Sequence, residues 1–281
     1  MTRPNFLFIG PDKTGSSWMY EILRQHPQCF VPIAKDIWFF DHYYQRGLDW
    51  YLSFFESAPD DAVAIGELSH NYLFSPSAAE RIAEDFPEMS LMTCLRDPVR
   101  RTFSHYLYLV RSGLTQLSFD EALEHFSELT ENSLYYKHLS RYLELFPREQ
   151  IKVLWFPQLA DDPEAFAQEM FDFLGVEHVA DLEYQQKVRP ASKPRSHLIA
   201  RALTFGGRAV RQAGLANLVG RVKHSRLVRL AYRPYGDAEK PDLSPETERA
   251  LRQRFAGDVR ALQETLNVDL RDWLPEETPA V

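Results

Sequence analysis

The sequence has only two cysteines in 281 residues, Cys29 and Cys94, which argues against a disulfide-stabilised scaffold and favours a reducing compartment, the cytoplasm. Cys94 lies in an apolar run, where we expect a buried thiol. Long hydrophobic runs are also missing: the N-terminal one has about five apolar residues, against roughly twenty needed to cross a bilayer. We therefore expect neither a signal peptide nor a membrane span. The sequence contains no HExxH motif and no cysteine cluster, so no motif predicts a metal site.

Short apolar runs alternate with amphipathic stretches along much of the chain. We expect strands at residues 5–9, 63–67, 90–95 and 151–155, and helices at 17–25, 78–85, 99–112 and 163–174. This alternation predicts an α/β fold in which helices flank a central parallel sheet. With 44% hydrophobic residues the chain can bury one sizeable core, so we expect a single domain over residues 1–281. A basic helical segment at about 195–235 and a C-terminal helix at about 244–267 complete the prediction.

The first apolar run leads into a turn that is bounded by Gly10 and Gly15 and followed by Ser16 and Ser17. Such a turn directs backbone N–H groups toward an anion, and the helix after it adds its positive end. The glycines and Ser17 match the nucleotide P-loop, but Ser16 stands where an NTPase has lysine, and the cation is Lys13 instead. The loop therefore predicts a phosphate ester other than a nucleoside triphosphate.

Two motifs about eighty residues apart resemble those of sulfotransferases that use 3′-phosphoadenosine 5′-phosphosulfate (PAPS). Residues 11–18, Pro-Asp-Lys-Thr-Gly-Ser-Ser-Trp, are similar to their 5′-phosphosulfate loop, P-x-K-[TSG]-G-T-[TS]. In residues 90–106 a predicted strand ends in Leu-Arg-Asp-Pro, and R-x-x-S-x-[YW] follows it, which is similar to the second motif of these enzymes. A third segment, from Asp36 through residues 47–52, looks like E-[IV]-x-F-F-[DN] and G-[IL]-x-W-Y of the heparan sulfate sulfotransferases and their bacterial relatives. The resemblance covers roughly residues 5–200.

The resemblance implies a P-loop-like three-layer fold and the transfer of a sulfuryl group from PAPS to a hydroxyl of a carbohydrate or glycosylated small molecule, with 3′,5′-ADP as the product. It assigns donor binding to the first loop, to a 3′-phosphate clamp in the second motif and to a late basic loop. These residues are Lys13, Thr14, Gly15, Ser16, Ser17 and Trp18 in the loop, Arg96 and Ser104 in the clamp, and Lys193 and Arg195 in the late loop.

Sulfuryl transfer is an in-line displacement in which the bridging oxygen becomes a phosphate oxygen, so most of the catalysis is positioning and charge stabilisation. Lys13, together with N–H and hydroxyl donors of the loop, fits this role without a metal. Asp97, the obvious candidate for a magnesium-binding Walker B aspartate, is expected to cap the following helix instead.

The attacking hydroxyl must also lose its proton to a nearby base. Asp36 is the first candidate, because it falls where the related carbohydrate sulfotransferases place a glutamate, although its side chain is one methylene shorter. Glu67, at the carboxyl end of the second predicted strand, is the second candidate, with neutralisation of Lys13 or Lys35 as its alternative role. His70 and His105 are reserve candidates.

Nine aromatic residues crowd into residues 38–55, and we expect Phe39 and Phe40 to pack under the sheet while two or three of the nine face a ligand.

Residues 184–236 hold twelve Lys or Arg and no Asp or Glu. This region could be a solvated helical face, an anionic acceptor surface or a membrane-surface helix. Nucleic acid is not expected as a partner, because the remaining residues carry 20 basic against 40 acidic side chains. A P-loop-type kinase or NTPase and a catalytically silent 3′-phosphoadenosine nucleotide-binding protein remain the alternative functions.

Overall fold

The computed structural model describes residues 2–186, 192–212, 232–234 and 241–276. Five strands form a parallel sheet in the order β2-β3-β1-β4-β5. Their bounds are β1 Phe6–Gly10, β2 Cys29–Phe30, β3 Ala64–Leu68, β4 Ser90–Leu95 and β5 Ile151–Trp155. The predicted α/β fold with a central parallel sheet is confirmed. The four expected strands lie within one residue of their predicted ends, and the two-residue edge strand β2 was not predicted.

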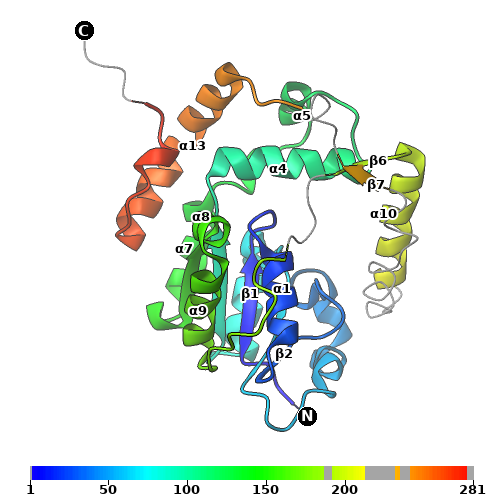
Figure 1. Ribbon diagram of the computed structural model, residues 1–281, viewed down its shortest axis with the longest axis vertical. Coiled ribbons are helices and arrows are strands. Elements are labelled where there is room, and N and C mark those ends of the chain that lie inside the picture. Colours follow the sequence, from blue (N-terminus) through cyan, green and yellow to red (C-terminus); the bar gives the residue numbers. More distant parts are fainter. Residues whose placement is uncertain (1, 187–191, 213–231, 235–240, 277–281) are drawn as a thin grey trace.

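Alternate side chains of the central strand β1 enter two separate apolar layers, because successive residues of a strand face opposite sides. Leu7 and Ile9 belong to one buried cluster with α3 (Pro76–Asp85) and α7 (Tyr135–Leu145). Phe6 and Phe8 belong to the other, with α1 (Ser16–Gln25) and α9 (Pro163–Leu174). Helices therefore cover both faces of the sheet, which explains why the strands read as continuous apolar runs (Figure 1).

The predicted helices are present, with small differences at their ends. Helix α3 starts two residues before its predicted start, at Pro76, because Ser75 caps it and proline suits the first turn. Helix α4 (Pro98–Arg111) follows β4 and lies across the end of the sheet at which the parallel strands terminate (Figure 1). The Oδ1 atom of Asp97 accepts hydrogen bonds from the N–H groups of Val99 (2.8 Å) and Arg100 (3.1 Å), so the predicted capping role of Asp97 is confirmed.

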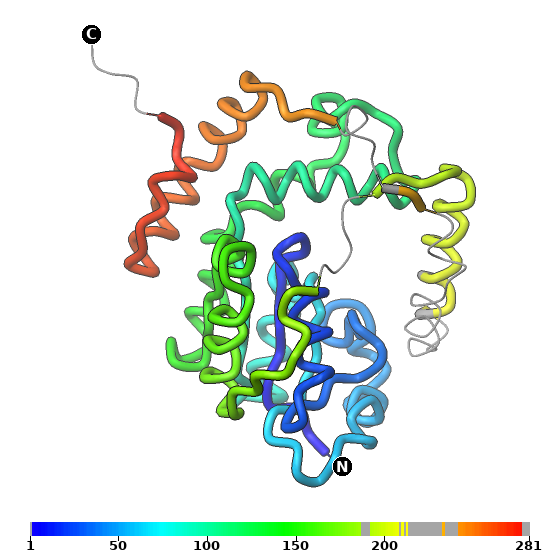
Figure 2. Tube along the Cα trace, viewed as in Figure 1, coloured from blue at the N-terminus to red at the C-terminus, as the bar shows by residue number. Residues whose placement is uncertain are grey.

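The remaining elements surround this framework. They are α2 (Leu48–Leu52), α5 (Phe119–His125), α6 (Glu128–Glu131), α8 (Phe156–Asp161), β6 (Ser192–Pro194), α10 (His197–Gln212), β7 (Tyr232–Pro234) and α13 (Pro245–Leu266). Helix α13 lies within the range predicted for the C-terminal helix, and α10 forms the first part of the predicted basic segment. Residues 213–231 and 235 of that segment lie outside the described residues. The N-terminus lies at the end of the sheet opposite α4 (Figure 2). None of the helices within the described ranges is both long and apolar enough to span a bilayer.

Candidate active site

The loop between β1 and α1 requires glycine at both of its ends. Gly10 has φ +126°, and a Cβ there would lie 2.2 Å from the carbonyl oxygen of His70. Gly15 has φ +91°, and a Cβ there would lie 2.4 Å from Cδ2 of Leu159. Gly15 is the N-cap of α1, and no side chain of the described residues caps that helix end. The first N–H groups of α1 are therefore available to an anion, as the sequence predicts.

The hydroxyl groups of the loop have two different partners. The Thr14 hydroxyl is fully buried and donates to the carbonyl oxygen of Pro11 at 2.8 Å, so it shapes the loop from inside. The hydroxyl oxygens of Ser16 and Ser17 accept hydrogen bonds from Nζ of Lys35 at 2.9 and 3.3 Å. Lys35 thus brings a second positive charge to the helix N-terminus. The sequence indicates Lys35 only as a possible partner of Glu67, because the observed contact links positions 18 and 19 residues apart.

Lys13 has a positive φ of 68°, which is uncommon for a residue other than glycine. Its Nζ atom lies 3.9 Å from the ring centroid of Tyr108 on α4. A cation–π contact of this kind favours a fixed position for the ammonium group. The strained backbone and the contact with α4 together place the displaced lysine of the loop beneath the crossing helix.

A buried ion pair fastens the loop to α4. Arg101 is fully buried and donates from Nη1 to Oδ1 of Asp12 at 2.8 Å, while its Nε donates to the hydroxyl of Ser133 at 2.8 Å. Burial alone would raise the pKa of the Asp12 carboxyl, but the neighbouring His105, Arg101 and Lys13 side chains outweigh burial and hold that pKa well below its usual range. Asp12 is therefore a carboxylate at neutral pH. Arg101, which matches the second motif, therefore holds the loop against α4.

His105 lies beside the same ion pair, with its Nε2 atom 4.0 Å from Oδ2 of Asp12. Burial lowers the pKa of His105 to about 4, despite the nearby Asp12 carboxylate. The ring is therefore neutral near pH 7. Its Nδ1 atom is buried and has no hydrogen-bond partner within the part of the chain that the structure describes.

The proposed 3′-phosphate clamp begins directly beside the loop. The guanidinium of Arg96 lies 4.6 Å from the ring centroid of Phe156, and its Nη1 donates to the carbonyl oxygen of Lys13 at 3.4 Å. Burial lowers the pKa of Arg96, but arginine stays protonated in proteins. Ser104 lies half-buried on α4, on the helix that follows Arg96.

Trp18 and the late basic residues lie further from the turn itself. The Trp18 side chain is buried against Phe166, and its Nε1 donates to the carbonyl oxygen of Tyr184 at 3.1 Å, so it supports α1 from the core. Lys193 lies in β6, opposite Arg233 of β7. Strand β6 packs against α4, and Arg195 follows it as an exposed residue. The late loop thus reaches the helix that also carries Ser104.

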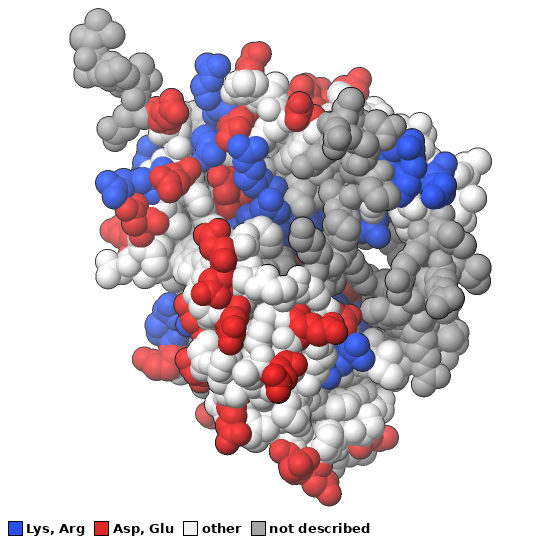
Figure 3. Space-filling view, viewed as in Figure 1, with Lys and Arg blue, Asp and Glu red and all other residues white. Residues whose placement is uncertain are grey.

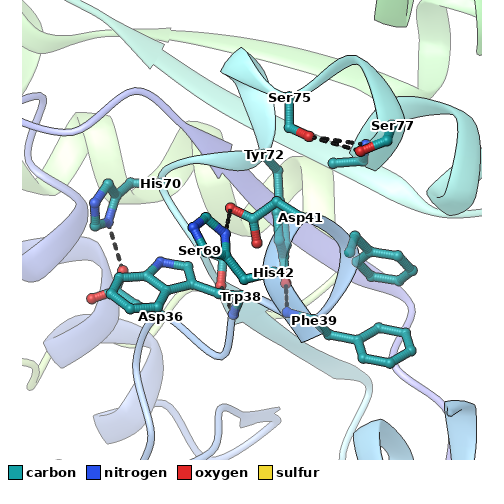
Figure 4. A network of polar contacts seen from close by, with 12 residues as sticks. Asp36, Trp38, Phe39, Asp41, His42, Ser69, His70, Tyr72, Ser75 and Ser77 are labelled. Atoms are coloured by element: carbon teal, nitrogen blue, oxygen red, sulfur yellow. Dashed lines mark hydrogen bonds and ion pairs between the residues drawn. The ribbon is translucent and has the colours of Figure 1, made fainter. Parts of the chain in front are cut away.

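The first candidate for the base, Asp36, lies after β2 in residues 36–55, which are called the acceptor segment from here on. Asp36 has φ +63° and its N–H donates to the carbonyl oxygen of Leu68 at 3.1 Å, which joins this segment to the end of β3. The Asp36 carboxylate is buried, and its Oδ1 lies 2.6 Å from Nδ1 of His70 (Figure 4). Asp36 and His70 are separate candidates in the sequence, but the structure brings them into direct contact. The ring of Trp38, which also has a positive φ, lies against His70 with a centroid distance of 6.3 Å.

Glu67 is 1% exposed, and three groups donate hydrogen bonds to its carboxylate. The Ser69 hydroxyl donates to Oε2 at 2.6 Å, the Tyr72 hydroxyl to Oε1 at 2.7 Å, and the N–H of Ile37 to Oε2 at 3.4 Å. Burial raises the pKa of Glu67 to about 7, although these hydrogen bonds act to lower it. Glu67 is therefore a buried acceptor for a polar network.

The same network fixes the acceptor segment. The N–H of Trp38 donates to the Ser69 hydroxyl at 3.2 Å, and the N–H of Phe39 donates to the Tyr72 hydroxyl at 2.9 Å (Figure 4). Through these two hydroxyls Glu67 holds consecutive backbone groups in a conformation that includes positive φ at Asp36 and Trp38. The network satisfies backbone groups that no regular strand or helix pairs.

The aromatic residues of this segment divide into two groups by burial. The expected packing of Phe39 and Phe40 in the core is confirmed, since both are fully buried. Buried with them are Tyr51, Phe54 and Phe55, whereas the half-buried aromatic residues are Trp38, Tyr43, Tyr44 and Trp50. At the far end of the segment, Arg46 donates a hydrogen bond to the carbonyl oxygen of Gln212 at the end of α10. The half-buried rings remain the candidates for contact with an acceptor.

Comparison with known proteins shows the family to which most of the chain is similar. Residues 3–193 match the protein family described as "Sulfotransferase domain". The membrane-associated sulfotransferase kil1 of Dictyostelium discoideum is 23% identical over 275 residues, which cover 66% of this chain and 58% of that protein. The bifunctional heparan sulfate N-deacetylase/N-sulfotransferase 3 of Homo sapiens is 33% identical over 196 residues, which cover 62% of this chain and 22% of that protein. This chain thus spans less than two thirds of either curated relative.

A solved structure is similar over almost the whole chain. The crystal structure of a sulfotransferase from Alicyclobacillus acidocaldarius superimposes with a TM-score of 0.72 at 26% sequence identity, and the match covers 97% of this chain and 99% of that chain. The similarity therefore extends beyond the loop to the arrangement of the sheet and its covering helices.

Proposed function

The chain belongs to the sulfotransferase family, and we propose that it transfers a sulfuryl group from PAPS to a hydroxyl of a carbohydrate or glycosylated small-molecule acceptor. One observation carries the proposal: the loop after β1 presents the N-terminus of α1 together with two cations, Lys13 and Lys35, and it adjoins Arg96. Three cationic groups around one helix N-terminus fit a donor that carries phosphates at two positions and a sulfate.

The residues around the loop can divide the donor between them. We propose that the N–H groups of Gly15, Ser16 and Ser17 bind the 5′-phosphosulfate, while Arg96 and Ser104 bind the 3′-phosphate. As the sulfur–oxygen bond breaks, negative charge develops on the bridging oxygen, and Lys13 would stabilise it there. Thr14 has its hydroxyl bonded within the loop, so its backbone N–H is the group that it could offer. Lys193 and Arg195 would approach the donor from the β6 side of α4.

Proton removal from the acceptor is assigned to the Asp36 side of the site. Asp36 lies next to the loop, since its partner His70 has its backbone against Gly10. Glu67 has a different role in this proposal, because its carboxylate is 1% exposed and already accepts three hydrogen bonds. We assign it to holding the acceptor segment. Carbohydrate and small-molecule acceptors would stack on half-buried rings such as Trp38 and Trp50.

Calorimetry and transfer assays test the function together. The chain should bind 3′,5′-ADP far more tightly than AMP, and ATP with magnesium should bind weakly, because only the first carries the 3′-phosphate. Transfer is measured with radiolabelled PAPS on a heparan-type oligosaccharide, a chitooligosaccharide, an alkyl glucoside and 2-naphthol. Equal affinity for AMP and 3′,5′-ADP would overturn the donor assignment. Tight binding of 3′,5′-ADP without turnover on any acceptor would favour a silent binding protein, and magnesium-dependent ATP binding would favour a kinase.

The basic segment supports a further proposal, peripheral contact with an anionic membrane surface. Helix α10 exposes Leu198 (79%), Ile199 (54%), Leu203 (39%) and Phe205 (48%), within a region that holds twelve Lys or Arg and no acidic residue. Exposed apolar side chains beside basic residues are typical of helices that lie on a membrane surface. On the face shown in Figure 3, acidic side chains predominate over the lower part, whereas Lys and Arg gather mainly near α13 and α10.

Cys29 and Cys94 are both free, which supports a cytoplasmic location.

A further inference from the structure

Two ionisable side chains, Asp36 and His70, form a hydrogen-bonded pair next to the donor loop. Nδ1 of His70 lies 2.6 Å from Oδ1 of Asp36, and the His70 side chain is 24% exposed while that of Asp36 is 9% exposed. The carbonyl of His70 lies against Gly10, so the pair adjoins the loop itself. Within the described residues, Nε2 of His70 has no hydrogen-bond partner. The Asp36 carboxylate therefore contacts the Nδ1 side of the ring, and Nε2 on the opposite side remains available to an acceptor hydroxyl.

The groups around His70 come from three parts of the fold. Asp36 faces it from the acceptor segment, Asp12 from the donor loop, and His105 from α4. The other histidine is poorly suited to receive a proton from an acceptor, because its Nδ1 atom is buried and its Nε2 atom faces Asp12. Asp36 has one carboxylate oxygen engaged by His70. The His70 side chain is 24% exposed, more than those of Asp36, Asp12 and His105, and its Nε2 atom is the one that could accept a proton.

We propose that Asp36 and His70 act as a dyad, in which Nε2 of His70 accepts the proton of the attacking hydroxyl and Asp36 positions the ring. The inference rests on the proposed sulfuryl transfer and identifies the base of that reaction. A carboxylate bonded to Nδ1–H fixes the tautomer that leaves Nε2 unprotonated, and it stabilises the imidazolium that forms. His70 is the catalytic residue of the pair, and Asp36 is a positioning residue.

The step balances without any further reactant. The acceptor O–H bond breaks, its proton passes to Nε2 of His70, and the acceptor oxygen forms a bond to sulfur. The bond between sulfur and the bridging oxygen breaks, its electron pair stays on the 5′-phosphate of the leaving 3′,5′-ADP, and Lys13 stabilises that charge. The imidazolium then releases its proton to solvent, so the net products are a sulfate ester, 3′,5′-ADP and one proton.

The dyad also accounts for the shorter acid at position 36. A glutamate at this place could reach an acceptor hydroxyl directly, whereas aspartate is one methylene shorter. In this chain the imidazole of His70 would span the missing length, because the ring contacts the carboxylate at 2.6 Å and is the more exposed side chain of the two. A positive φ at Asp36 and the Trp38 ring against His70 maintain this arrangement.

A double-mutant cycle tests whether the two residues act together. The variants are Asp36→Asn, His70→Gln and their combination, assayed with radiolabelled PAPS on the acceptor of the panel that the wild-type chain sulfates fastest. We expect His70→Gln to lower kcat by about 10² to 10⁴, the usual worth of a general base, with the affinity for 3′,5′-ADP unchanged. The double variant should fall no further than the slower single variant, because residues that act as a unit are not additive. His178→Gln is the matched control, since His178 pairs with Glu164 at 3.4 Å away from the donor loop and from residues 36–55, and it should leave kcat unchanged.

Two further measurements distinguish a base from a structural residue. The rate of His70→Gly should rise at least about ten-fold with added imidazole if the side chain only transfers a proton. Proton NMR of the wild-type chain should show a low-field Nδ1–H resonance that disappears in Asp36→Asn, and this readout does not depend on turnover.

The outcomes separate this inference from the proposed function. A His70→Gln variant that transfers sulfuryl at the wild-type rate, or single-variant losses that multiply in the double variant, would overturn the dyad while sulfuryl transfer stands. An unchanged Nδ1–H resonance in Asp36→Asn would also overturn it. A wild-type chain that transfers sulfuryl to none of the acceptors would overturn the proposed function and the assignment of the base with it.

Discussion

Replacement of Glu67 by glutamine should change how the stability of the protein depends on pH. Burial raises the pKa of the Glu67 carboxyl from 4.5 to about 7. A carboxyl whose pKa is higher in the folded state binds its proton more tightly there, so stability falls as pH rises between these two values. One pKa unit corresponds to about 1.4 kcal/mol, which gives an effect on the order of 3 kcal/mol across this window. The amide of glutamine does not titrate and should lack this contribution.

The measurement is the free energy of unfolding in urea, followed by tryptophan fluorescence, for the wild-type chain and Glu67→Gln between pH 5 and pH 8. Other titrating groups act on both proteins, so the difference between the two isolates Glu67. We expect the wild type to lose about 2.5 kcal/mol relative to the variant as pH rises from 5 to 8, with most of the change below pH 7. Glu124→Gln, at an exposed position on α5, is the control and should show no such trend.

Two results would refute the reasoning about Glu67. A difference between wild type and variant that stays constant with pH would mean that the carboxyl does not titrate in this window. A wild type that gains stability relative to the variant as pH rises would mean that the hydrogen bonds from Ser69, Tyr72 and Ile37 outweigh burial and lower the pKa.

Three other predictions follow from the donor loop and from α10. Arg96→Ala should weaken 3′,5′-ADP binding by about ten-fold or more in calorimetry, since a charge-assisted bond to phosphate is worth about 1.5 to 3 kcal/mol, and unchanged affinity would remove Arg96 from the clamp. Lys13→Ala should lower kcat by about 10² to 10³ while donor affinity falls less, and a variant that kept most of its kcat would make Lys13 a structural cation. In co-sedimentation with anionic vesicles, Leu198→Ser and Phe205→Ser should reduce binding several-fold, whereas neutral vesicles should bind neither protein; equal binding of variant and wild type would contradict the membrane contact.

Sequence patterns predicted the parallel sheet and the anion-binding loop because both depend on local features. A buried parallel strand reads as an apolar run, and the loop needs glycine at Gly10 and Gly15 wherever the backbone turns tightly. The cap at Asp97 was also predictable, since it bonds to N–H groups two and three residues ahead. The edge strand β2 was missed because two residues carry no periodic signal.

Contacts between distant parts of the chain were not predictable. Lys35 reaches Ser16 and Ser17, and Asp36 reaches His70, because β3 lies between β2 and β1 in the sheet. Motif spacing marks Arg101 as part of the second motif, but the direction of its side chain depends on how α4 crosses the loop. For these residues the sequence indicates the chemistry, and the packing of the elements determines the role.

Among the described residues, the side chains that fasten the donor loop to α4 differ from those that fasten the acceptor segment to β3. Asp12 and Arg101 fasten the loop to α4, whereas Glu67, Ser69 and Tyr72 fasten residues 37–39 to the end of β3. The acceptor segment can therefore be regarded as an exchangeable cassette on a fixed donor frame. Grafting residues 41–55 of a relative onto this chain is a practical route to new acceptor preference, because the donor site does not rely on that stretch for its support.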